Sequence, residues 1–118
     1  MKVTLPWPPT QLNPNNKLHW SKKYKKAKPY RVDCFYLARE AGLNHVPWDG
    51  PIYLYLDFYA PTRNKPDDDN IVAAFKAGRD GLADALGVDD KRFKCVPNVS
   101  DEIGGMVKVT ISDKGPGQ

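Results

Sequence analysis

The chain has 118 residues and a net charge of +4, which suffices for one compact domain and is too short for two ordinary ones. No apolar run approaches the roughly 18 residues of a membrane span. The N-terminus lacks the long apolar region of a signal peptide, so we expect a cytoplasmic protein. Cys34 and Cys95 exclude a disulfide framework; we expect two reduced, partly buried thiols, although the sequence leaves a single bridge open.

The charges are unevenly distributed along the chain. Residues 1–32 contain eight lysines and arginines and no acid, so this segment carries +8 and the remainder must carry −4 to reach the total of +4. A basic front and an acidic rear on one small protein predict an anionic partner. Acids close to such a partner are tolerated where bound cations invert the local charge.

The N-terminal third predicts one strand, one loop and one helix. Lys2–Leu5 alternates in polarity and favours a short strand. Residues 8–19 are rich in proline and asparagine, which predicts a loop. Pro29 suits the first turn of a helix that runs to about Ala41 and is stopped by Gly42.

The middle of the chain predicts a strand followed by a long helix. Ile52–Tyr59 is apolar on both faces, so we expect a central strand. Residues 70–86 favour one helix, with Asp69 or Asn70 as N-cap and Gly87 as the stop. Its apolar face is formed by residues at helical spacing: Ile71, Phe75, Gly78 and Leu82.

Two further strands complete the predicted fold. They are Phe93–Val96, ended by Pro97, and Met106–Ile111. The order β-α-β-α-β-β predicts a small mixed α/β domain over residues 1–112, with two main helices packed on a mixed sheet. Residues 113–118 are expected to form a flexible tail.

The acidic run Asp67-Asp68-Asp69-Asn70 is the strongest indication of chemistry. Three adjacent carboxylates repel one another unless a cation intervenes. The alternative is a solvated turn whose acids are favoured by the dipole of the following helix. At about 100° per residue, Lys76 and Asp80 project in nearly the same direction as Asp69 if the helix is regular. Any surface helix can show such a line of charges, so its specificity alone is weak.

A second acidic pair, Asp89-Asp90, follows the predicted helix. Carboxylates from two separate segments could hold Mg²⁺, which prefers hard oxygen ligands with open positions for water and phosphate. Lys76 would then add positive charge to the reacting phosphate, or orient the water. A calcium loop is excluded by Val72, which stands where that loop needs glycine. His19 and His45 are isolated, and no cysteine and histidine set has zinc spacing.

The basic segment at residues 17–26 mixes cations with aromatic rings. Cations neutralise phosphates, and Trp20 and Tyr24 could stack on exposed bases. The alternative is a solubilising surface with Trp20 folded onto the core. No base-reading pattern is evident, so we expect recognition of shape and phosphate. The candidate DNA-binding residues are Lys17, His19, Trp20, Lys22, Lys23, Lys25, Lys26, Lys28, Arg31, Arg63 and Lys65.

Together these motifs resemble those of RusA-type Holliday-junction resolvases. Leu5-Pro6-Trp7-Pro8-Pro9 with Asn13-Pro14-Asn15 resembles the N-terminal signature of that family. The acidic run resembles its Asp-x-Asp-Asn motif, Asp89-Asp90 its second acidic motif and Lys76 its essential lysine. The likeness extends from about residue 3 to residue 111. One departure is clear: the usual lysine position, four residues after the motif aspartate, holds Ala73.

The resemblance implies a small homodimeric endonuclease that uses Mg²⁺, with Mn²⁺ as a substitute, to make paired symmetric nicks in four-way DNA junctions. It implies Asp67, Asp69 and Asp90 as metal ligands and Lys76 as the assisting cation. Asp80 and Asp89 remain open as further ligands. The alternatives are a non-catalytic protein that binds branched DNA and a nuclease for other branched or single-stranded DNA.

Overall fold

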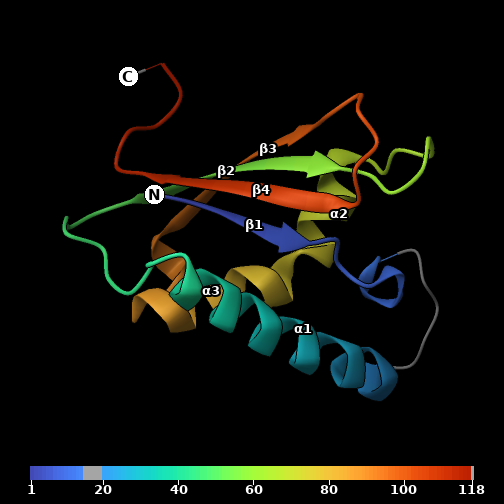
Figure 1. Cartoon of the computed structure of the whole chain (residues 1–118), viewed down its shortest axis with the longest axis horizontal. Helices are drawn as coiled ribbons and strands as arrows, with labels where there is room; N and C mark the ends of the chain where they lie inside the picture. The colour runs from blue at the N-terminus through green and yellow to red at the C-terminus, as the bar shows by residue number, and fades with distance from the viewer. Residues whose placement is uncertain (15–19, 118) are drawn as a thin grey trace.

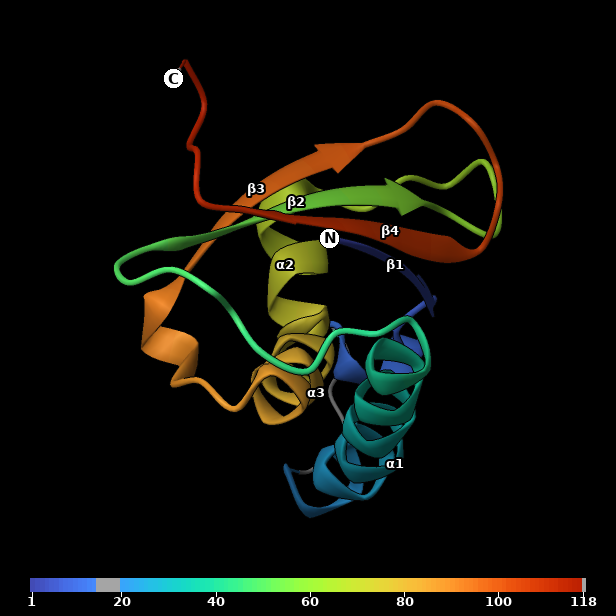
Figure 2. The same ribbon diagram turned by 60° about the vertical axis from the view of Figure 1, so that its left-hand side comes forward.

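The computed structural model describes residues 1–14 and 20–117 as one mixed sheet with three α-helices packed on one of its faces (Figures 1 and 2). The order of strands in the sheet is β1-β4-β2-β3. The elements are β1 (Lys2–Pro6), η1 (Thr10–Leu12), α1 (Trp20–Glu40), β2 (Ile52–Tyr59), α2 (Asp68–Ala74), α3 (Lys76–Leu86), η2 (Asp90–Arg92), β3 (Phe93–Val99) and β4 (Met106–Ser112). No helix in the described ranges combines the length and the apolar character needed to cross a membrane.

The pairing of the strands follows from their connections. β4 lies antiparallel to both β1 and β2, whereas β2 and β3 are parallel. Parallel neighbours need a crossover connection, and α2 with α3 supplies it. The prediction of a central strand at Ile52–Tyr59 is confirmed, because β2 has a partner on each side.

The core lies between the sheet and the helices. Alternate residues of each strand face the helices, as the burial of Leu54, Leu56 and Phe58 shows. The ring of Phe75 meets the ring of Phe58 edge to face, with centroids 5.8 Å apart. Tyr30 of α1 donates a hydrogen bond of 2.6 Å to the carbonyl oxygen of Pro6, which fastens α1 to β1. Burial raises the pKa of the Tyr30 hydroxyl far above its ordinary value, so it remains a donor.

The first predicted helix is longer than expected. α1 begins at Trp20 rather than near Pro29, and residues 20–26 of the basic segment lie in its first half. Lysine, alanine and tyrosine in this segment tolerate helix well, which lets it continue through the exposed Pro29. The basic residues from Lys22 onward therefore lie on a regular helix.

The single helix predicted for residues 70–86 is wrong, because α2 and α3 are separate helices that meet at Phe75. The backbone of Phe75 has φ −82° and ψ −1°, and its amide is shared between the carbonyl oxygens of Ile71 and Val72. The break sends the Phe75 ring into the core against Gly78, where a Cβ would lie 2.5 Å from that ring. The predicted apolar face is nevertheless buried throughout: Ile71, Phe75, Gly78 and Leu82.

Three smaller expectations also meet the structure. Gly87 ends α3 with φ 66°, in the left-handed region, as predicted. Pro97 does not end β3, which continues to Val99; an edge strand accepts proline because one side needs no ladder partner. Cys34 and Cys95 are both free thiols, the first buried and the second half-buried.

Candidate functional site

The acidic run stands at the beginning of α2. Asp67 occupies the N-cap position, not Asp69 or Asn70 as predicted, and its carboxylate accepts no capping hydrogen bond. Asp68 and Asp69 lie in the first turn, where the helix dipole favours negative charge. All three side chains are exposed, and none makes a hydrogen bond or ion pair with another described residue. They are therefore three neighbouring carboxylates without a described cation to balance them.

A second group of carboxylates lines a cleft of about 370 Å³ formed by α3, the segment that leads from α3 into η2, and one residue of α1. The Lys76 ammonium nitrogen lies 3.2 Å from Asp80 Oδ2, one helical turn away. The Lys76 side chain is 64% exposed and that of Asp80 18%, so the lysine is the accessible member. The lining residues are Arg31, Lys76, Asp80, Ala83, Asp84, Val88, Asp89 and Asp90.

Cations of the protein balance most acids of this cleft. Arg31 binds Asp84 in a two-bond arrangement, with N–O distances of 2.7 Å and 2.9 Å. Hydrogen bonds from Arg31 hold the pKa of the Asp84 carboxyl below its usual value. The carboxylate of Asp89 accepts the backbone amide of Lys91, which lowers its pKa. Asp90 faces Arg79 at 3.5 Å.

Arg79 is a functional candidate that the sequence did not indicate. It lies on α3 beside Asp80, and its Nη2 approaches Asp90 Oδ2. Its Nε is buried and has no hydrogen-bond partner, which is costly for a charged group. Cys95 lies next to it; burial raises the pKa of that thiol, and Arg79 opposes the rise. The signal in the sequence was only an arginine adjacent to an aspartate.

The predicted line Asp69–Lys76–Asp80 does not lie on one helix. The break at Phe75 puts Asp69 on α2, while Lys76 and Asp80 pair on α3. Carboxylate oxygens suit a hard cation such as Mg²⁺. However, within residues 1–14 and 20–117 no three acidic, histidine or cysteine side chains stand close enough to hold a metal ion together. The structure joins Asp80, Asp89 and Asp90 around one cleft and leaves the acidic run separate.

The basic residues divide into free and paired groups. Exposed lysines without a described ion-pair partner line α1: Lys22, Lys25, Lys26 and Lys28. The Lys23 ammonium lies 3.4 Å from the carbonyl oxygen of Asn13, while Arg31 and Lys65 bind Asp84 and Asp101. Arg63 is exposed beside Lys65.

Three predicted DNA-binding residues cannot be assigned surroundings. Lys17 and His19 lie outside the described residues, and the side chain of Trp20, which begins α1, is also outside the description.

Comparison with known proteins identifies a relative of this chain. No protein-family model matches the chain. An uncharacterized protein of Xylella fastidiosa (strain Temecula1 / ATCC 700964) is 46% identical over 114 residues, which cover 93% of this chain and 74% of that protein.

Proposed function

We propose that this chain, which belongs to the same family as that Xylella fastidiosa protein, is a Mg²⁺-dependent endonuclease that resolves four-way DNA junctions. The observation that carries the proposal is the cleft in which Lys76 and Asp80 of α3 lie beside Asp89 and Asp90. It brings an accessible ammonium and the second acidic motif to one place. The three unbalanced carboxylates at the start of α2 are the remaining part of the proposed site.

The roles of the chain's own groups follow from their charge and exposure. In the proposal Lys76 leaves Asp80 to contact a non-bridging oxygen of the scissile phosphate, where it offsets the charge that develops. Asp67, Asp69 and Asp90 would hold the metal, with Asp80 and Asp89 as further ligands; because the acidic run stands apart from the cleft, the proposal requires the start of α2 and the cleft to approach each other when metal and DNA bind. The chemistry that Mg²⁺ or Mn²⁺ supplies there is polarisation of the phosphate, activation of water and stabilisation of the leaving oxygen.

The basic surface of α1 supports a DNA substrate. Four exposed lysines follow one another along the first half of this helix, and no acid precedes Asp33. Such a row binds phosphates by releasing condensed counterions, without reading bases. Tyr24 is 61% exposed within this row, which leaves its ring available for stacking.

The proposal is tested by cleavage of a synthetic four-way junction in the presence of Mg²⁺. Wild type should give nicked duplexes, whereas Asp69→Asn should bind the junction at least as well and cut nothing, because loss of a carboxylate reduces repulsion of phosphate. Asp68→Asn is the matched control: it removes the same charge one residue away and should still cut. A wild-type protein that binds junctions and never nicks them with Mg²⁺ or Mn²⁺ contradicts the proposal.

A non-catalytic protein that binds branched DNA is the second candidate. It is favoured by the ion pairs of the cleft, since Asp80, Asp84 and Asp90 each face a cation of the protein. It predicts that Asp69→Asn leaves binding intact and that wild type has no cleavage to lose. A panel of forks, flaps and single strands separates junction resolution from a nuclease with other branched or single-stranded substrates.

We further propose that the protein acts as a homodimer. A four-way junction has two equivalent strands to cut, and a two-fold symmetric dimer presents one site to each. Cutting both strands within one complex leaves no half-resolved junction.

A further inference from the structure

The sheet has a second face, turned away from the three helices, which no α-helix of the described residues covers (Figure 2). Along β2 every second residue points to this face, from Tyr53 to Tyr59. The segment after β4 crosses only one end of it: Gly115 is packed against the ring of Tyr53, and the Tyr55 hydroxyl donates to the carbonyl oxygen of Lys114 at 2.7 Å. The part around Asp57 is left open.

The charges of this outer face are mostly positive and unbalanced. Lys2, Lys94 and Lys108 come from three different strands, and none makes an ion pair with a described residue. Asp57 is the only acid on the strands of this face within the described residues.

The contact between Asp57 and its neighbours explains why one lysine stays free. Lys108 is the direct cross-strand partner of Asp57, yet no ion pair joins them. Instead Asp57 accepts a hydrogen bond of 3.2 Å from the side-chain amide of Asn98. The Lys108 ammonium lies over the ring of Tyr59, 5.1 Å from its centroid. A cation held on an aromatic face keeps its full charge for an anionic ligand.

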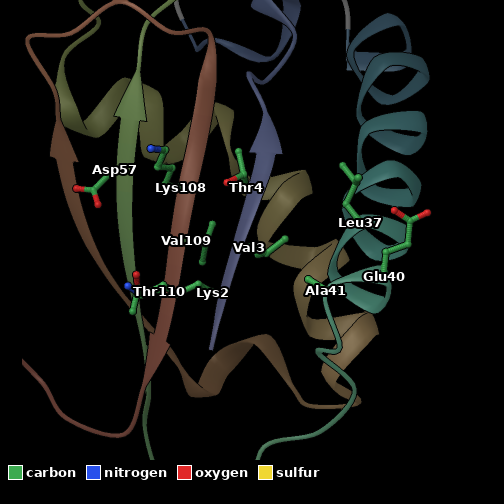
Figure 3. Close-up of a pocket in the computed structure, with 10 residues that line it drawn as sticks. All are labelled: Lys2, Val3, Thr4, Leu37, Glu40, Ala41, Asp57, Lys108, Val109 and Thr110. Atoms are coloured by element: carbon green, nitrogen blue, oxygen red, sulfur yellow. The ribbon is translucent and has the colours of Figure 1, made fainter.

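A hollow of about 530 Å³ begins on this face and reaches the end of α1 (Figure 3). Lys2, Thr4, Lys108 and Thr110 contribute ammonium and hydroxyl groups from β1 and β4 to its lining. These groups are donors of the kind that bind phosphate oxygens. Asp57 and Glu40 bound the hollow on opposite sides.

We propose that the outer face of the sheet is a second nucleic-acid surface, which binds the sugar-phosphate backbone of a DNA segment. The proposal rests on the proposed function and adds a surface to it. The alternative occupant of such a face is a second copy of the chain that binds through the same face. That contact would place Lys2, Lys94 and Lys108 against the same three lysines of the other copy and would be repulsive. A polyanion meets no such repulsion. Because α1 lies on the opposite side of the sheet, the two basic surfaces contact different segments of DNA.

The experiment compares Lys94→Gln/Lys108→Gln with Lys94→Arg/Lys108→Arg, which keeps both charges. Junction affinity is measured without divalent metal at several salt concentrations, so that no cutting occurs. We expect the Gln variant to bind more weakly and its plot of log affinity against log salt to be shallower by about one unit per lysine removed. The Arg variant should behave as wild type, and the midpoints of thermal unfolding should agree.

An opposite change provides a second test on the same face. Asp57→Asn should tighten junction binding, whereas Asp49→Asn, which alters net charge equally on the loop before β2, should leave affinity unchanged. If both variants bound the junction more tightly and to the same degree, the gain would come from net charge alone, and the inference would be overturned.

The outcomes separate this inference from the proposed function. If wild type cuts junctions and the Gln variant keeps the wild-type affinity and salt dependence, the outer face does not bind DNA, although the nuclease stands. If the Gln variant changes the sedimenting mass and not the salt dependence, the face joins two copies and the inference fails. If the Gln variant binds weakly but cuts at the wild-type rate with saturating DNA, both proposals are supported. If wild type neither binds nor cuts any DNA, both fail.

Discussion

Gly81 lies at the contact between α1 and α3, where a side chain has no room. A Cβ at this position would stand 2.4 Å from the carbonyl oxygen of Arg31 and 3.0 Å from the Cβ of Cys34. The glycine therefore sets how closely the two helices pack, at the expense of helix propensity. The neighbouring Gly78 instead meets the ring of Phe75, a side chain rather than a backbone group.

The two glycines predict different costs of the same substitution. Gly81→Ala should lower the free energy of unfolding by about 1–3 kcal/mol, because backbone atoms must separate. Gly78→Ala should cost less, since a ring gives way more easily and alanine favours the helix. Denaturant unfolding of both variants checks this; an equal or larger loss for Gly78→Ala would contradict it.

The ion pair between Arg31 and Asp84 predicts a pH dependence. The pKa of Asp84 lies below its ordinary 3.8 in the folded protein because Arg31 donates to the charged form. Its contribution to stability is therefore present above pH 3.8 and is lost as pH falls through the lowered folded value. Both side chains are more than 40% exposed, so we expect less than about 1 kcal/mol. Asp84→Asn should be slightly less stable than wild type at pH 7 and equal to it in strong acid.

At the scale of the element, α1 combines a packed face with a basic one. Tyr30, Cys34 and Ala38 are buried against the sheet and α3, while Lys25 and Lys26 are exposed. Pro29 lies between these groups and is exposed, so its ring causes no clash with the core. The helix therefore holds the basic residues at fixed spacing.

Proline in the middle of α1 predicts a stabilising substitution. Pro29→Ala restores one backbone donor and should raise the free energy of unfolding by about 1–3 kcal/mol, at the lower end because the site is exposed. Lys28→Ala, one position earlier, is the control and should have little effect. No gain in the unfolding midpoint of Pro29→Ala would mean that the helix bends favourably at this residue.

At the scale of the whole molecule, the proposed dimer predicts linked cutting of two strands. The active protein should sediment at twice the 13.3 kDa of the chain. Mixtures of wild type with excess Asp69→Asn should form dimers with one functional site, which nick one strand and leave the junction half resolved. Full resolution in proportion to the wild-type fraction alone would show that each chain acts independently.

The sequence by itself determined the local features of this protein. The apolar residues on both faces of Ile52–Tyr59 predicted a central strand with the observed bounds. Gly87 predicted the end of α3, since glycine tolerates the left-handed conformation there. The periodic apolar positions from Ile71 to Leu82 predicted a buried face. The sequence also identified the residue types of the proposed site, namely an acidic run, an acidic pair and a basic N-terminal segment.

Only the tertiary structure decided which of these charges meet. Helical phase predicted Asp69, Lys76 and Asp80 in one line, but the break at Phe75, whose ring packs against Phe58, removed Asp69 from that line, while Lys76 kept its partner Asp80 one turn away. The sequence predicted Arg31 as a DNA-binding residue of the basic surface. In the structure α1 packs on α3, and Arg31 forms an ion pair with Asp84 instead. Local periodicity contains no information on a contact between distant segments such as Arg31 and Asp84. Such contacts depend on how the side chains of different elements pack together in the shared core.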